Sequence, residues 1–177
     1  MIMKTFDRCH AKPCGSPCFN LKLAIDSICV DFLISEIHRA IISYYDGAPI
    51  VFDSSIKYDP TSLNVGNVND DLYVDFLFGV GGGENTIELK RQTYANILPS
   101  YLLPVGSSPW DDLYCIDKNG VVYVWNHDNP DLYISTPIAN SFDVFFSNLW
   151  PDKPDCLDAT YGIIESESWL DPDLPNM

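Results

Sequence analysis

Hydrophobic residues recur every three or four positions in three segments, as they do along the buried side of a helix. The pattern predicts helices over residues 31–45, 85–95 and 140–150. Gly47 follows the first segment and suits the left-handed end of a helix. Asn85 and Glu88 have the spacing of a capping box at the start of the second. Phe142 and Phe145 lie on the apolar face of the third.

Short β-prone runs separate these helices. The sequence predicts strands over residues 49–53, 72–80 and 102–105, and a loop over residues 56–71. The strongest signal is a hairpin, in which the strands 113–117 and 121–125 are joined by Lys118, Asn119 and Gly120. Strands joined by tight turns favour an α+β fold, with a mixed or mostly antiparallel sheet and helices packed on it in a single domain.

The flanking segments differ from this central part. Residues 1–28 predict an irregular N-terminal arm, and residues 29–150 predict the α+β domain. Residues 151–177 contain seven acidic residues, one lysine and four prolines. This composition predicts an acidic, proline-rich C-terminal tail.

The charge of the chain limits its partners. Ten basic and 25 acidic residues give a formal net charge of -15. Direct binding to nucleic acid or to an anionic membrane requires an excess of basic residues, so neither is predicted. A basic protein would be attracted to this chain. Because no segment has the length of a membrane span or the apolar core of a secretory signal, we expect a cytoplasmic protein with reduced cysteines.

Candidate metal ligands occur near the N-terminus. Cys9, Cys14 and Cys18 lie close to His10 in the sequence. Three cysteines and one histidine can bind zinc, but the spacing lacks the paired ligands of structural zinc sites. Cys115 lies inside a predicted strand, where cysteine usually packs as a small hydrophobe. We therefore predict reduced thiols, no metal and no cofactor.

The hairpin and its flanks contain the residues that could carry chemistry. Asp111 and Asp112 precede the first strand, and His127 and Asp128 follow the second. The start of one strand lies opposite the end of the other, so these four side chains could meet and bind the metal of a hydrolase.

The alternative is a protein-binding surface. Exposed aromatic residues among acidic ones, such as Trp110 and Tyr133, can anchor a partner within a charged rim. Trp125 is better explained by packing in the core. No arrangement of a nucleophile and a base is found, so an enzyme is not predicted.

Five segments in order resemble the SUKH superfamily, the Smi/Knr-like proteins. They are Ile41–Pro49, Leu103–Gly106, Asp112–Asp117, Val122–Asp128 and Ala139–Phe146. Residues 1–33 do not show the acidic helix with which the family usually opens. The usual Gly-Asn or Gly-Asp before the hairpin is replaced by Trp110, Asp111 and Asp112.

The resemblance implies an α+β fold without catalysis. Many bacterial members resemble immunity proteins that neutralise a cognate toxin, often a nuclease, whereas fungal members act as regulatory scaffolds. For an immunity protein we expect a basic, nuclease-like toxin to contact Trp110, Asp111, Asp112, His127, Asp128, Asp131 and Tyr133. The residues expected to define the fold are Gly47, Pro104, Asn119, Gly120, Trp125, Ser141, Phe142 and Phe145.

Overall fold

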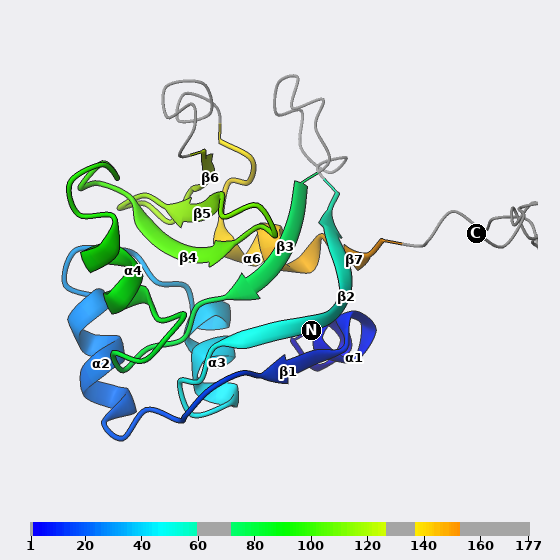
Figure 1. Cartoon of the computed structure of the whole chain (residues 1–177), viewed down its shortest axis with the longest axis horizontal. Coiled ribbons are helices and arrows are strands. Elements are labelled where there is room, and N and C mark those ends of the chain that lie inside the picture. Colours follow the sequence, from blue (N-terminus) through cyan, green and yellow to red (C-terminus); the bar gives the residue numbers. More distant parts are fainter. Residues whose placement is uncertain (1, 60–71, 127–136, 153–177) are drawn as a thin grey trace, which may run out of the picture.

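The computed structural model describes residues 2–59, 72–126 and 137–152 of the chain. These residues form an α+β fold in which helices pack on an antiparallel sheet of seven strands (Figure 1). The helices are α1 (Ile2–Cys9), α2 (Leu21–Ile28), α3 (Glu36–Tyr44), α4 (Ile87–Thr93) and α6 (Phe142–Ser147). The strands are β1 (Ala11–Pro13), β2 (Ile50–Tyr58), β3 (Leu72–Leu77), β4 (Leu103–Ser107), β5 (Leu113–Ile116), β6 (Val122–Trp125) and β7 (Leu149–Pro151). The predicted fold class is confirmed.

The sheet follows the chain from β1 to β6 in order, with β7 added beside β2. Every pairing between these strands is antiparallel. From β1 to β6, neighbours in sequence are also neighbours in the sheet. The central strands β4 and β5 are buried along their whole length. Pro104 is one of these buried residues, and it lies where the register between β4 and β5 shifts.

One face of the sheet is covered by α3 and α6, which lie behind it in Figure 1. Tyr58 of β2 and Tyr114 of β5 pack against Phe145 of α6, with ring centroids 5.2 and 5.1 Å apart. His38 of α3 stacks on Phe142 of α6 at 3.9 Å. The aromatic face predicted for the last helix is therefore the centre of the core.

The predicted hairpin is confirmed as β5 and β6. Asp117 organises its turn, because one carboxylate oxygen accepts from the backbone N–H of Asn119 at 2.8 Å and of Val121 at 2.9 Å. Gly120 has a φ of 81°, a backbone conformation that residues with a side chain rarely adopt. Trp125 is buried, as predicted, and pairs with Leu113 on the face opposite Tyr114.

The helix ends follow local signals in part. The Ser35 hydroxyl caps α3 by accepting from the N–H of His38 at 3.0 Å. The Ser141 hydroxyl caps α6 in the same way, by accepting from the N–H of Val144. Gly47 ends the first helical segment with a φ of 83°. The predicted capping box of the second helix is wrong: Thr86 is the N-cap, and the Glu88 side chain accepts from Gly81 instead.

Residues 2–28 are not an irregular arm, and this prediction is wrong. They form α1, β1 and α2, and Phe6 packs against the rings of Tyr44, Tyr45 and Phe146. The Arg8 guanidinium donates to the carbonyl of Leu149 at 2.6 Å. Helices as short as α1 are marginal in isolation, so tertiary contacts of this kind stabilise them.

A second correction concerns β2 and β7. Residues 56–58, predicted as the start of a loop, continue β2. Residues 149–150, predicted as the end of the last helix, and Pro151, predicted as the first residue of the tail, form β7 and pair with those same residues. Residues 56–58 pair with both β3 and β7, and residues 149–151 form a strand through their pairing with β2. A local sequence pattern does not contain that information. Residues 153–177, most of the predicted tail, lie outside the described residues.

Candidate functional site: an acidic and aromatic surface

The turn between β4 and β5 contains three of the residues predicted to bind a partner. Ser108 fixes its backbone: its hydroxyl oxygen accepts from the N–H of Trp110 at 3.2 Å and of Asp112 at 3.1 Å. Its own N–H donates to the carbonyl of Asp112 at 2.9 Å. Asp111 is exposed at the tip with a left-handed φ of 64°. The exposed side chains at this tip therefore rest on a turn that a buried serine holds.

Trp110 is the exposed aromatic residue of this turn. Its side chain is 63% exposed, and its ring meets that of Tyr73 edge to face, with centroids 5.6 Å apart. Tyr73 is anchored in turn, because its hydroxyl donates to a carboxylate oxygen of Asp152 at 2.9 Å and its carbonyl accepts from Tyr114 at 2.6 Å. Aromatic residues that are exposed but held in place are suited to contacts with a protein partner.

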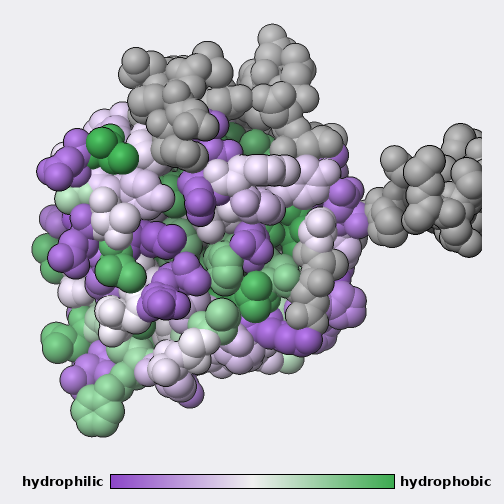
Figure 2. Space-filling model, in the orientation of Figure 1, coloured by the Kyte–Doolittle hydropathy of each residue, from purple (hydrophilic) through white to green (hydrophobic). Residues whose placement is uncertain are grey.

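The neighbouring part of β3 belongs to the same surface. Tyr58 faces α6, so the preceding Lys57 faces the other side of the sheet, and Tyr73 pairs with Lys57. Asp75, two residues further along β3, follows Tyr73 on that side. In Figure 2 this side faces the viewer, and over β2 and β3 it mixes hydrophilic and hydrophobic side chains.

The Asp111 carboxylate influences two titratable groups near it. Burial raises the pKa of Asp75, and the nearby Asp111 carboxylate raises it further. Burial and Asp111 also raise the pKa of the Tyr94 hydroxyl. Like charges placed this close favour the approach of a cationic group, which would stabilise both carboxylates.

We call the residues Tyr73, Asp75, Trp110, Asp111 and Asp112 the acidic rim. The three turn residues were predicted from the sequence to bind a partner, whereas Tyr73 and Asp75 were not. The signal was present in the sequence of β3, where Tyr73 and Asp75 alternate with hydrophobic residues. His127, Asp128, Asp131 and Tyr133, also predicted to contact a partner, lie outside the described residues.

The described part of the chain contains no cluster of metal-ligating side chains of the kind that the metal hypotheses require. Among residues 2–59, 72–126 and 137–152, no group of three or more His, Cys, Asp or Glu side chains could hold an ion. The buried Cys9 thiol donates to the Leu149 carbonyl, and burial raises its pKa. Burial likewise raises the pKa of Cys115, which disfavours the reactive thiolate.

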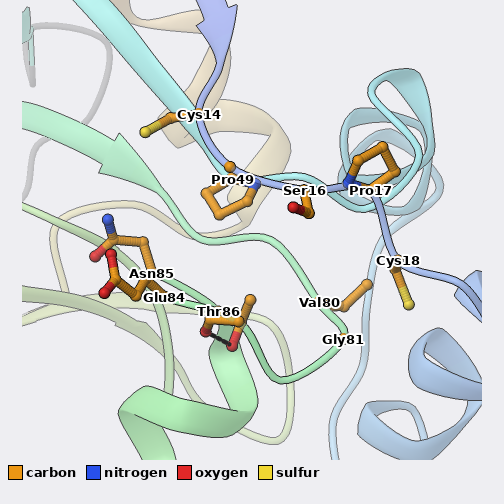
Figure 3. Close-up of a pocket in the computed structure, with 12 residues that line it drawn as sticks. Cys14, Ser16, Pro17, Cys18, Pro49, Val80, Gly81, Glu84, Asn85 and Thr86 are labelled. Carbon is orange, nitrogen blue, oxygen red and sulfur yellow. Dashed lines mark hydrogen bonds between the residues drawn. The ribbon is translucent and has the colours of Figure 1, made fainter.

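A cavity of about 310 Å³ lies between segments 14–18 and 80–86 (Figure 3). Pro49 and Val80 contribute to its walls. Cys14 and Cys18 are free thiols whose side chains point in different directions. The Thr86 hydroxyl donates to the Gly83 carbonyl at 2.7 Å, which helps to shape the glycine-rich wall.

Fold and site together describe an α+β protein with an acidic and aromatic rim, in which Trp110 and Asp111 are exposed. The chain belongs to the SMI1 / KNR4 family (SUKH-1), which matches residues 34–148. It is 27% identical over 115 residues to the SPbeta prophage-derived uncharacterized protein YokK of Bacillus subtilis (strain 168). That alignment covers 62% of this chain and 57% of the relative, so the chain matches little more than half of the relative's length. No solved structure matches the chain.

The match begins after α2 and ends before β7. In the described residues, α1, β1, α2 and β7 therefore lie outside the matched segment, although α1 and β7 contact each other and the core. No helix in the described ranges has the length and apolar character needed to cross a membrane.

Proposed function

We propose that this chain is an immunity-type protein that binds and neutralises a basic protein toxin, nuclease-like in its charge, through the acidic rim. The observation that carries the proposal is that the exposed Trp110 and Asp111 meet the half-buried Tyr73 and Asp75 on one side of the sheet. Membership of the SMI1 / KNR4 family supports it, because the family is generally non-catalytic and of the immunity type.

Electrostatics supports a cationic partner. The chain has a formal net charge of -15, so a basic protein is attracted from a distance and oriented as it approaches. Burial raises the pKa of Asp75, and repulsion from Asp111 adds to this effect. At contact, a lysine or arginine side chain beside the two carboxylates would relieve that repulsion. A nuclease has a basic surface for phosphate groups, and an acidic inhibitor can occupy that surface by mimicking their charge.

Aromatic packing would supply the non-polar part of the contact. Trp110 is largely exposed, and tryptophan is among the residues that contribute most to binding energy at protein interfaces. An arginine of the partner could stack on this ring while it pairs with the carboxylates.

The test begins with capture of partners from the native cells by the full chain and by two variants. Asp111→Lys reverses a charge in the acidic rim, and Glu84→Lys makes the same charge change on the exposed glycine-rich loop. We expect the native chain and Glu84→Lys to retain one dominant partner, and Asp111→Lys to lose it. Expressed alone, that partner should arrest growth, and co-expression of the native chain should restore it.

Two results would contradict the proposal. Equal capture of the toxin by all three chains would exclude the acidic rim as the binding surface. Capture of several housekeeping or signalling proteins, none of them toxic, would favour the regulatory scaffold that the family resemblance also allows.

A further inference from the structure

We propose that the outer side of α2 is a self-association surface, on which α2 of a second copy of this chain packs in antiparallel orientation. The inner side of α2 buries Ile25 and Ile28 in the core. The outer side exposes Leu23, whose side chain is 69% exposed, and the preceding Phe19 is 98% exposed. Val30, two residues after the end of the helix, is 79% exposed. Large apolar side chains this exposed, grouped around one short helix, indicate a contact surface.

The exposed side chains border a common hollow. A depression of about 490 Å³ is lined by Phe19–Leu23 together with Asp26. Figure 2 shows hydrophobic side chains projecting at the lower left corner of the molecule, where α2 begins in Figure 1. The surface thus offers both a projecting apolar group and a recess beside it, which is the shape that a self-complementary contact requires.

The charged residues on the outer side of α2 indicate that a second copy of this chain binds there. Lys22 and Asp26 lie four residues apart on the exposed side of α2, next to Leu23. When two such helices pack antiparallel about a two-fold axis, Lys22 of each copy lies opposite Asp26 of the other, so the contact contains two ion pairs.

Charge repulsion disfavours other arrangements of two copies. The chain as a whole carries a formal charge of -15, so most pairs of surfaces repel. Lys22 and Asp26 cancel, which makes the outer side of α2 a neutral area on an acidic molecule. None of the residues of the acidic rim takes part, so a dimer would leave two rims free. The inference therefore goes beyond the proposed function and does not depend on it.

The experiment is sedimentation equilibrium of the full chain over a wide concentration range. An interface of this small size is expected to give a reversible dimer with a dissociation constant on the order of 10–100 µM. Leu23→Glu should weaken the dimer about ten-fold or more, because it places two carboxylates in the apolar centre. Leu89→Glu on α4 is the matched control, since Leu89 is also exposed, and it should dimerise like the native chain.

A charge exchange provides the sharper test. Lys22→Glu and Asp26→Lys should each weaken the dimer several-fold, roughly three-fold or more, because each puts like charges opposite one another. The double exchange K22E/D26K should restore the dissociation constant to within about two-fold of the native value. All four positions that are changed are exposed, so thermal melting is expected to show native-like folding in every variant.

Three results would overturn the inference. The chain could remain monomeric at every concentration. A dimer could form that neither Leu23→Glu nor the single charge changes affect, which would place the interface elsewhere. The chain could remain monomeric while Leu23→Glu loses a captured toxin, in which case the outer side of α2 contacts that partner rather than a second copy.

Discussion

Acidification should destabilise this protein through His38, whose side chain is only 1% exposed in the packing between α3 and α6. Its Nδ1 atom is buried and has no hydrogen-bond partner among the described residues. Burial lowers the pKa of His38 from 6.5 to about 3, because the charged imidazolium cannot be solvated where it stacks on Phe142.

The direction and size of this change in stability follow from proton linkage. Below pH 6.5 the unfolded chain binds a proton at this histidine and the folded chain does not, so stability falls as the pH falls from 6.5 towards about 3. Each pH unit in this window costs about 1.4 kcal/mol. Between roughly pH 7.5 and 4.5 the contribution of His38 therefore amounts to about 3 kcal/mol. For a chain of this size such a loss lowers the melting temperature by roughly 6–12 °C.

The assay compares urea unfolding of the native chain and His38→Leu across this pH range. His38→Leu changes the packing, but its cost is the same at both pH values, and the carboxylates common to both chains cancel. We expect the difference in unfolding free energy between the two chains to shift by about 3 kcal/mol in favour of the variant at the lower pH. Parallel pH profiles for the two chains would refute the reasoning, since they would mean that His38 titrates equally in the folded and unfolded states.

Two further predictions concern the packing that stabilises the fold. Gly79→Ala should destabilise the protein by about 3 kcal/mol, because the new Cβ would lie 2.2 Å from the Gly47 carbonyl oxygen. In the control Gly83→Ala the new Cβ would have its nearest atom at 4.0 Å, so stability should change by less than about 0.5 kcal/mol. Equal melting temperatures for the two variants would contradict this. Arg8→Met should lower the free energy of unfolding by about 2 kcal/mol, because it removes the hydrogen bond to Leu149 and the stacking over Trp150 at 3.7 Å. It should also shift the tryptophan fluorescence. An unchanged melting temperature would show that Arg8 does not anchor α1.

The parts of the fold that sequence predicted are those whose cause is local. An Asn-Gly turn between two β-prone runs fixed the β5–β6 hairpin, and phenylalanine spacing identified α6. The strand β7 could not be found in this way, because residues 149–151 are a strand only through their pairing with residues 56–58. The helix α1 was missed for the same reason, since Phe6 and Arg8 are held by residues far away in the sequence.

The candidate site was predicted to a similar extent. The turn residues Trp110, Asp111 and Asp112 stand out by composition, so the sequence located one half of the acidic rim. Tyr73 and Asp75 come from β3, and only the order of strands in the sheet brings them beside that turn. A pattern along the chain records which side chains share a face of a strand, but it does not record which strand lies next to which loop.

The rate at which the captured toxin associates with the chain, measured by stopped-flow mixing at low and at high salt, tests the acidic rim most directly. The native chain and Glu84→Lys should associate rapidly, and the rate should fall steeply as salt is added. The double charge reversal D75K/D111K should slow association at low salt about ten-fold or more and flatten the salt dependence. If the double reversal associates at the native rate, with the native salt dependence, the acidic rim is not where this protein meets its partner.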